Sequence, residues 1–318
     1  MTLTFTPAQV ATITTCVHTA HILGPLMAAA AQTMRLGDKK AASRPTGTIP
    51  QSVPQPASKK RPTGPIHRII QGECLEMMAK IPDRSIDFIC ADFPYNISGK
   101  GGLTMRNDQI IKADFGEWDK FPSEEAYFEF VFNVCAEYRR ILKPNASMVL
   151  FFGYRHAGWI AHELQRRGLF TFRMPLIWVK DNPMPSVKKT TFRSAYEMGL
   201  WLINDGGTFA QPRTFNFLTQ ARMRTVMSYL IGRDGHKRTQ HPTEKPELLT
   251  RRLVEIFSNE GDIVLDNFAG GGTTGVAAFK AGRNAISIER EANYIAMIEK
   301  RQRAVEARLA ERRDDEGA

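Results

Sequence analysis

The chain has 318 residues, of which 42% are hydrophobic and 24% charged, so it can bury the core of one large domain or two modest ones. Forty-three lysines and arginines against 33 aspartates and glutamates give a formal charge of +10, which suits a polyanionic partner. Four scattered cysteines without a C-x-x-C pair argue against a disulfide scaffold and a standard zinc site, and no apolar run reaches the ~20 residues that span a bilayer. We therefore expect a globular cytoplasmic protein with no bound metal and no membrane partner.

The first 65 residues divide into two segments. Residues 8–34 are rich in Ala and Thr, lack the basic start of a secretory signal and are interrupted by Gly24-Pro25, so 1–35 is predicted to be an accessory segment. Residues 36–65 are rich in Pro, Gly, Ser and Lys, and this composition predicts a flexible basic linker because it cannot offset its own ordering entropy. We expect the folded domain to cover residues 66–313, with 314–318 as a tail.

From residue 66 onward, buried strands alternate with helices. Strands are predicted at 85–92, 147–153, 172–180, 195–203, 262–268 and 285–289. Helices are predicted at 124–142, 157–167, 246–258 and 273–281, and a last, charged helix runs to about 313. The first of these helices is expected to stop at Lys143-Pro144-Asn145. This alternation favours an α/β fold with a doubly wound, mostly parallel sheet.

One long segment, residues 181–240, interrupts the alternation. It is punctuated by Pro and Gly, and it carries nine basic against four acidic residues with aromatic residues between them. Long inserts in compact domains are usually functional or disordered, and bases interleaved with aromatics are typical of a nucleic-acid surface. A solvated charged loop is the alternative. The candidate DNA contacts are Lys188, Lys189, Arg193, Arg213, Arg222, Arg224 and Arg233.

The tetrapeptide Asp92-Phe93-Pro94-Tyr95 ends the predicted strand 85–92. Open α/β sheets bind ligands at the carboxyl ends of their strands, and here an acid, a Pro-fixed turn and an aromatic ring are adjacent. An incidental aspartate in a strand-ending turn would explain an isolated tetrapeptide of this kind as well. Its interpretation therefore depends on the rest of the chain.

A second candidate site is the glycine-rich turn that joins strand 262–268 to the following helix. Its glycines would let a ligand approach bare backbone and the N–H groups of a helix start. No lysine follows the glycines, which excludes a P-loop. From these residues alone, a dinucleotide-binding turn with Glu289 as the ribose acid stays open.

Together these motifs resemble the DNA amino-methyltransferases that use S-adenosylmethionine. Asp92 to Tyr95 is similar to the D-P-P-Y motif of that family, and Asp266 to Thr274 is similar to its D-x-F-x-G-x-G-T-T turn. The sequence H-P-T-E-K-P at 241–246 resembles the family's H-x-T-x-K-P element, and residues 71–76 resemble its G-D-C-L-E opening. The resemblance covers roughly residues 66–300. The motif order, with the catalytic motif first, is similar to that of the permuted beta group.

The resemblance implies a Rossmann-like methyltransferase sheet in which residues 181–240 form an inserted target-recognition region. It implies methyl transfer from S-adenosylmethionine to the exocyclic amine of a base flipped out of double-stranded DNA. The residues implied in catalysis are Asp92, Phe93, Pro94 and Tyr95. The residues implied in cofactor binding are Asp266, Phe268, Ala269, Gly270, Gly272, Thr273, Thr274, Glu289, His241, Thr243 and Lys245. The same resemblance implies a possible homodimer and a possible cognate restriction endonuclease. It also implies a prokaryotic or phage-encoded protein associated with the nucleoid.

The chemistry explains these residue types. An exocyclic amine is a weak nucleophile because its lone pair is delocalised into the ring, so Asp92 and a nearby main-chain carbonyl would accept its two N–H bonds and free the lone pair. Tyr95 would stack on the flipped base, Glu289 would bind the ribose hydroxyls and the turn 268–275 would hold the methionine end. Ring-carbon methylation needs the Pro-Cys pair of another family, and this chain contains none.

Two positions depart from the family pattern: Phe93 replaces the first proline of D-P-P-Y, and Glu73 replaces the aspartate of G-D-C-L-E. By resemblance, Asp92 favours adenine N6 over cytosine N4. A Phe93 ring that pointed into the base pocket would narrow it toward cytosine, whereas a ring packed in the core would leave room for adenine. We expect core packing and hence adenine N6, with cytosine N4 as the alternative.

Two other classes of function explain less of the chain. An NAD-dependent oxidoreductase would use only the glycine turn and Glu289. A non-catalytic DNA-binding protein would use the basic charge and leave Asp92 to Tyr95 without a role.

Overall fold

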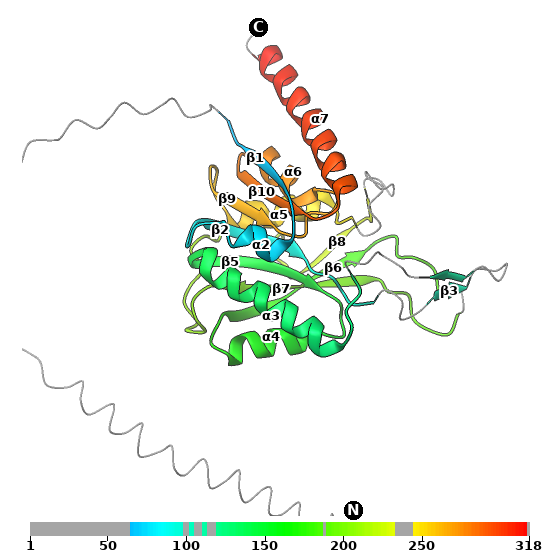
Figure 1. Ribbon diagram of the computed structural model, residues 1–318. Helices are drawn as coiled ribbons and strands as arrows, with labels where there is room; N and C mark the ends of the chain where they lie inside the picture. The colour runs from blue at the N-terminus through cyan, green and yellow to red at the C-terminus, as the bar shows by residue number, and fades with distance from the viewer. Residues whose placement is uncertain are drawn as a thin grey trace, which may run out of the picture. The chain divides into compact units, whose positions relative to one another are not determined.

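The structure is a computed structural model that describes residues 64–97, 102–104, 110–112, 119–186, 189–232 and 244–316. An eight-stranded sheet in the order β1-β10-β9-β2-β5-β7-β6-β8 lies at its centre (Figure 1). The predicted accessory segment 1–35 and nearly all of the predicted linker 36–65 lie outside the described residues. Over the described ranges, every helix is too short or too polar to span a membrane.

The sheet is mostly parallel, as predicted. Its strands are β1 (His67–Gln71), β2 (Ile86–Asp92), β5 (Leu142–Phe152), β6 (Thr171–Lys180), β7 (Tyr196–Ile203), β8 (Val226–Tyr229), β9 (Ile263–Asp266) and β10 (Asn284–Glu289). Only β7 runs antiparallel to its neighbours, β5 and β6. A separate antiparallel pair consists of β3 (Gly102–Thr104) and β4 (Ile110–Lys112).

Helices cover both faces of the sheet. One face carries α2 (Cys74–Met78), α3 (Glu124–Ile141) and α4 (Ala157–Arg166); the other carries α5 (Glu247–Phe257) and α6 (Thr273–Lys280), with α7 (Ala292–Glu316) beside α6 and β1 (Figure 1). The middle of β2, residues 88–91, is continuously apolar because both faces of this strand are covered. Ile89 and Ala91 face the core under α3, whereas Phe88 and Cys90 face the core under α5. The predicted doubly wound α/β architecture is confirmed.

Strands β2 and β9 lie side by side, and the chain leaves them in opposite directions. From β2 it passes through α3 to β5 on one side, and from β9 it passes through α6 to β10 on the other. This reversal is the switch point at which open α/β sheets bind ligands. Asp92 ends β2 and Asp266 ends β9, so the two motifs of the sequence meet at one edge of the sheet.

Residues 181–240 are not the single insertion that we predicted. Strand β7 falls within this range, yet it pairs with both β5 and β6 inside the sheet, and β8 extends the sheet beyond β6. The inserted parts are therefore the two connections on either side of β7, residues 181–195 and 204–225, whose described residues form no strand or helix.

Two predicted boundaries also differ from the structure. Helix α3 ends at Ile141, just before Pro144, as predicted, but β5 begins at Leu142 rather than at 147, so Pro144 lies in the first part of this strand, opposite the register irregularity between Ile86 and Phe88. Helix α7 continues to Glu316, so residues 314–316 are helical rather than part of a tail.

A half-buried histidine, His67, explains why α6 contains a glycine. His67 Nε2 and Nδ1 lie 2.8 Å from Ser287 Oγ and Gln302 Oε1, and this network connects β1, β10 and α7. Burial lowers the pKa of His67, which favours the neutral ring. A Cβ atom at Gly275 would lie 2.2 Å from His67 Nε2 and 2.6 Å from Ser287 Oγ.

We expect Gly275→Ala to lower the free energy of unfolding by about 1–3 kcal/mol, the usual cost of overpacking, because the new methyl group would collide with this network. The helix-propensity gain of alanine, about 1 kcal/mol at most, is too small to offset it. Urea denaturation of both proteins measures the difference. Gly158→Ala in α4 is the control, since no atom lies within 4 Å of the added carbon, and it should be neutral or stabilising. Equal effects of the two substitutions would contradict the steric explanation.

Candidate active site

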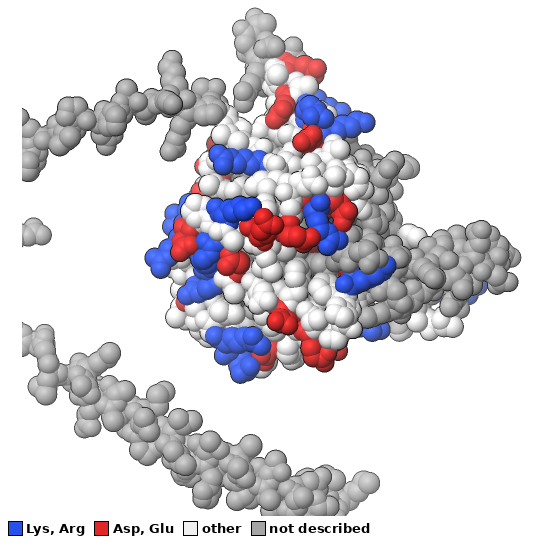
Figure 2. Space-filling model, in the orientation of Figure 1, with Lys and Arg blue, Asp and Glu red and all other residues white. Residues whose placement is uncertain are grey.

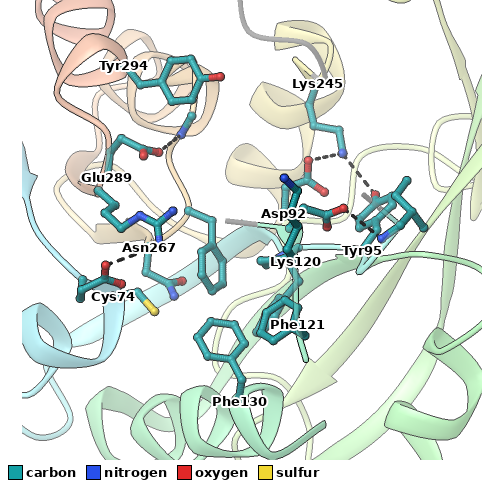
Figure 3. Close-up of a pocket in the computed structure, with 18 of the residues that line it drawn as sticks. Cys74, Asp92, Tyr95, Lys120, Phe121, Phe130, Lys245, Asn267, Glu289 and Tyr294 are labelled. Atoms are coloured by element: carbon teal, nitrogen blue, oxygen red, sulfur yellow. Dashed lines mark hydrogen bonds and ion pairs between the residues drawn. The ribbon is translucent and has the colours of Figure 1, made fainter. Parts of the chain in front are cut away.

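The switch point opens into a cavity of about 230 Å³ (Figure 3). A water molecule occupies ~30 Å³ in the liquid, so this cavity has room for an organic ligand. Many of the described residues that line it come from the ends of β2, β7, β9 and β10, and Lys245 comes from the segment before α5. The turn after β1, the start of α2, residues 119–121, α3 and α7 complete the lining. A second hollow of about 40 Å³ beside it is the size of a single water.

Asp92 presents two different carboxylate oxygens to this cavity. Lys245 Nζ donates a hydrogen bond to Asp92 Oδ2, while Oδ1 is buried and has no hydrogen-bond partner among the described residues. Burial raises the pKa of the Asp92 carboxyl; Lys245 opposes this rise and Glu197 adds to it by repulsion. A buried acceptor without a partner is costly, so Oδ1 is poised to accept a hydrogen bond from a ligand.

The Phe93 ring packs into the core, as we predicted. It is 1% exposed, and its centroid lies 4.5 Å from that of Phe152 and 4.8 Å from that of Phe268. The Phe93 N–H donates to the Phe151 carbonyl at 3.1 Å. Tyr127 Oη donates to the Pro94 carbonyl at 2.9 Å, whereas no hydrogen bond between described residues uses the Phe93 carbonyl. The Phe93 ring thus packs in the core, and the Phe93 carbonyl is an acceptor next to Asp92 that has no donor among the described residues.

Tyr95 is held from two directions. Its hydroxyl donates to Glu197 Oε2 at 3.1 Å, and Lys245 Nζ lies 3.4 Å from the same hydroxyl (Figure 3). The turn after Tyr95 is fixed by buried Asp119, which accepts from the N–H groups of Asn96 and Ile97 at 2.7 and 2.9 Å.

The sequence analysis missed both Glu197 and Asp119. Glu197 interrupts the apolar strand β7, and that polar position was the available signal for it. Asp119 lies in no recognisable pattern.

The glycine turn folds onto the end of β10. The Gly270 N–H donates to Glu289 Oε2 at 2.8 Å, and the Glu291 N–H donates to Oε1 at 2.9 Å. Gly272 has a φ of 75°, and a Cβ atom there would lie 2.8 Å from Ile298 Cγ2, so this position requires glycine. Asn267 also lines the cavity, and its buried Nδ2 has no acceptor among the described residues. Asn267 was not among the predicted residues.

The predicted cofactor residues divide between the two hollows. Phe268, Gly270, Glu289 and Lys245 line the large cavity. Asp266, Ala269, Thr273 and Thr274 line the small one, and Gly272 lies against Ile298 of α7. His241 and Thr243 lie outside the described residues. Burial raises the pKa of Asp266 to about 7, and hydrogen bonds from Thr274 and the Phe268 N–H oppose the rise.

Lys245 makes contacts that differ from the prediction. We expected it to bind the cofactor, but its ammonium pairs with Asp92 and lies 2.8 Å from Glu197 Oε2. Its position depends on Arg301 of α7, which donates to Glu244 Oε1 and the Gly271 carbonyl, both at 2.9 Å. Arg301 therefore joins the segment that carries Lys245 to the glycine turn.

The charge of the cavity is opposite to that of the whole chain. Its described lining includes five carboxylates against three cationic side chains. The carboxylates belong to Glu73, Asp92, Asp119, Glu197 and Glu289, and the cations to Lys120, Lys245 and Arg290. In a protein of formal charge +10, this excess of negative charge favours a ligand with a positive centre.

The predicted DNA contacts occupy different parts of the sheet. Lys189 and Arg193 are exposed in the connection that follows β6 at the carboxyl edge, and Arg222 and Arg224 are exposed ahead of β8. Lys188 and Arg233 lie outside the described residues. On the face with α3 and α4, Figure 2 shows Lys and Arg interspersed with Asp and Glu, so the described part of this face does not form a basic field.

Arg213 lies at the opposite edge of the sheet from Asp92. It is 3.8 Å from Asp87 near the start of β2, and its N–H donates to the Asn145 carbonyl at 2.7 Å. We therefore leave Arg213 out of the proposed DNA surface.

Comparisons with known proteins agree with these features. Residues 86–300, more than half of the chain, match the DNA methylase family of N6 and N4 methyltransferases. The type II methyltransferase M.HinfI of Haemophilus influenzae is 34% identical over 252 residues, which cover 76% of this chain and 69% of that protein. The type II methyltransferase M2.DpnII of Streptococcus pneumoniae is 29% identical over 238 residues, which cover 73% and 88%.

Two solved structures share the fold. The complex of M1.HpyAVI with SAM has a TM-score of 0.56 and 26% identity, and the match covers 74% of this chain and 99% of that one. The cytosine-N4-specific PvuII DNA methyltransferase has a TM-score of 0.58 over 74% and 87% of the two chains, and at 17% identity it supports the fold alone.

The core position of Phe93 yields a prediction. Phe93→Pro would remove the ring from its contacts and the N–H donor from Phe151, so we expect the free energy of unfolding to fall by about 3–5 kcal/mol, as for loss of a buried Phe. Phe93→Leu keeps the N–H and most of the packing and should cost about 1 kcal/mol. Urea denaturation of the three proteins measures both values. A proline variant as stable as the parent would show that the ring contributes little to the core.

Proposed function

Because the chain belongs to the family of S-adenosylmethionine-dependent DNA amino-methyltransferases, we propose that it methylates adenine at N6 in double-stranded DNA. The observation that carries this proposal is the pair of acceptors at the end of β2. The buried Asp92 Oδ1 and the Phe93 carbonyl are both without a donor among the described residues. An exocyclic amine has two N–H bonds to give, which is the number that this pair can accept.

The cavity has the groups that S-adenosylmethionine requires. Each oxygen of Glu289 accepts one main-chain N–H and keeps a further lone pair, so the carboxylate can also accept two ribose hydroxyls. Asn267 Nδ2 is a buried donor in need of an acceptor. The excess of carboxylates around the cavity suits a sulfonium cation. When bound, S-adenosylmethionine supplies a methyl group that is activated by the positive sulfur.

The residues of the chain prepare the amine. By accepting both N–H bonds, Asp92 Oδ1 and the Phe93 carbonyl draw the nitrogen toward tetrahedral geometry and free its lone pair. The Tyr95 ring lines the same cavity and is fixed through its hydroxyl, which suits stacking on a base taken out of the duplex. Closure around the base would exclude water and strengthen these hydrogen bonds.

Adenine is favoured over cytosine by two features. Asp92 resembles the first residue of the adenine enzymes, and the Phe93 ring lies in the core rather than in the space for the base. A purine is larger than a pyrimidine, so an unobstructed pocket supports adenine. Cytosine N4 is the alternative, because both amines need the same two acceptors.

Exposed basic residues in the connections before and after β7 fit the DNA partner. Exposed Lys189 and Arg193 lie in the connection after β6, and exposed Arg222 and Arg224 lie ahead of β8. These side chains would contact phosphates or base edges. A homodimer and a cognate restriction endonuclease remain expectations from the family resemblance, and the type II names of M.HinfI and M2.DpnII support the second.

The proposal is tested by incubating the protein with unmethylated genomic DNA and S-adenosylmethionine and analysing the nucleosides by mass spectrometry. We expect N6-methyladenine. Asp92→Ala should form none, because the main acceptor is lost, while calorimetry should give a Kd for S-adenosylmethionine within about threefold of the parent, less than 1 kcal/mol.

Each other outcome has a definite meaning. N4-methylcytosine without N6-methyladenine would replace the proposed base. Loss of cofactor binding together with activity in Asp92→Ala would place Asp92 in the cofactor site instead.

The DNA surface is tested by the double substitution Arg222→Ala/Arg224→Ala. If each arginine contacts one phosphate, the slope of log K against log salt should become less negative by about 0.9 per contact, or about 1.8 in all. Fluorescence anisotropy with labelled duplex at a series of salt concentrations measures the slope. Arg213→Ala at the opposite edge of the sheet is the control and should leave the slope unchanged. An unchanged slope in the double variant would place the DNA surface elsewhere.

A further inference from the structure

Glu197 lies on the antiparallel strand β7 and belongs to none of the sequence motifs. It nevertheless contacts three polar side chains at the site. Its Oε1 lies 2.8 Å from Lys180 Nζ, and its Oε2 lies 2.8 Å from Lys245 Nζ. Tyr95 Oη donates to the same Oε2 at 3.1 Å. The Glu197 side chain is only 17% exposed, so these contacts are screened little by water.

Three oxygen atoms surround the Lys245 ammonium, one for each of its protons. It donates to Asp92 Oδ2, lies 2.8 Å from Glu197 Oε2 and lies 3.4 Å from Tyr95 Oη. An ammonium held in this way stays on one side of the Asp92 carboxylate. The other oxygen, Oδ1, is left buried and without a described donor, which is the state that the reaction needs.

Without the Glu197 carboxylate, Lys245 would have Asp92 as its only strong partner. A flexible ammonium beside a single carboxylate can move between its two oxygens, since Lys has three rotatable donors on a flexible stem. In that position it would compete with the amine for Oδ1. Glu197 thus acts on the reaction through Lys245 and Tyr95 and not by touching the base.

We propose that Glu197 is a positioning residue for methyl transfer, which anchors Lys245 and Tyr95 so that Asp92 Oδ1 remains open to the amine. The proposal rests on the proposed function. It assigns to β7, a strand without a recognised motif, a direct part in arranging the catalytic acid.

The charges around Asp92 predict how its pKa should change when Glu197 loses its charge. Asp92 is faced by Lys245 from the segment before α5, by Glu197 from β7, by Tyr95 and by Asp266 from β9. Burial opposes ionisation of Glu197, but Lys245 and Lys180 outweigh it and lower the pKa of Glu197 to about 2, so this carboxylate stays charged at working pH. Its repulsion helps to keep the pKa of Asp92 raised.

The test uses three variants and a single-turnover methylation assay on duplex DNA across a range of pH. Glu197→Gln keeps the size of the side chain and removes its charge. We expect the single-turnover rate constant to fall about 10- to 100-fold, the cost of a misplaced catalytic group, with the Kd for S-adenosylmethionine nearly unchanged. Because a repelling charge is lost, the pKa of Asp92 falls, and the acid limb of the rate profile should move to lower pH.

Lys180→Met should shift the profile in the opposite direction. It removes the positive charge that balances Glu197 without touching Asp92, so the repulsion of Asp92 by Glu197 is no longer compensated, the pKa of Asp92 rises and the acid limb should move to higher pH. A merely structural Glu197 would give lower stability in both variants, with no opposed shifts. Comparison of the two variants therefore separates positioning from stability even if one of them is less stable.

Glu163→Gln in α4 is the matched control. Glu163 is also a carboxylate held between two cations, Arg166 and Arg167, and these cations likewise lower its pKa to about 2, but it lies on a surface helix. This variant should keep the rate constant and the pH profile of the parent. If the parent and Glu163→Gln are active while Glu197→Gln keeps the same rate and acid limb, the inference is wrong and the proposed function is not. If the parent transfers no methyl group, both are wrong.

Discussion

One buried ammonium group connects the parts of this site. Lys245 comes from the segment before α5, and its ammonium pairs with Asp92 at the end of β2 and with Glu197 on β7. Removing three charges from water is costly, and the cost is offset only where each charge has partners at hydrogen-bonding distance. Here Lys180 and Tyr95 complete the partners of Glu197. The arrangement leaves Asp92 Oδ1 without a hydrogen-bond donor among the described residues. This costs stability, but it keeps the oxygen available to a ligand.

The site also shows why chain order and spatial order are separate properties. Asp92 of β2 precedes the glycine turn after β9 by more than half of the chain, but β2 and β9 are neighbours in the sheet. The reversal of the chain between them is a property of the finished sheet. A permuted sequence can therefore build the same cavity, provided that the two strands end side by side.

Much of this arrangement was accessible from the sequence. Six strands of the large sheet, the longer helices and the position of Asp92 at a strand end follow from local patterns of apolar residues and glycines, and the core packing of Phe93 was also predicted. The short elements β1, α2 and β8 were not predicted. Glu197, Asp119 and Asn267 were missed because each acts through partners far away in the chain, and local periodicity carries no information about such partners. The predicted insertion 181–240 was too long for a related reason. A strand was predicted at 195–203, but its own residues do not show that it pairs with β5 and β6 inside the sheet.

The contacts of Arg301 connect the order in which the chain is synthesised with the assembly of the site. Asp92 and Tyr95 leave the ribosome before the arginine that joins Glu244 to the glycine turn, because that arginine belongs to α7. Until then, nothing in the nascent chain fixes the segment of Lys245 against that turn through Arg301. Tyr294 of the same helix lines the cavity, so the cavity has its full described lining only once α7 is in place. All eight strands of the sheet precede α7 in the chain, so the sheet is synthesised before the helix that completes the cavity.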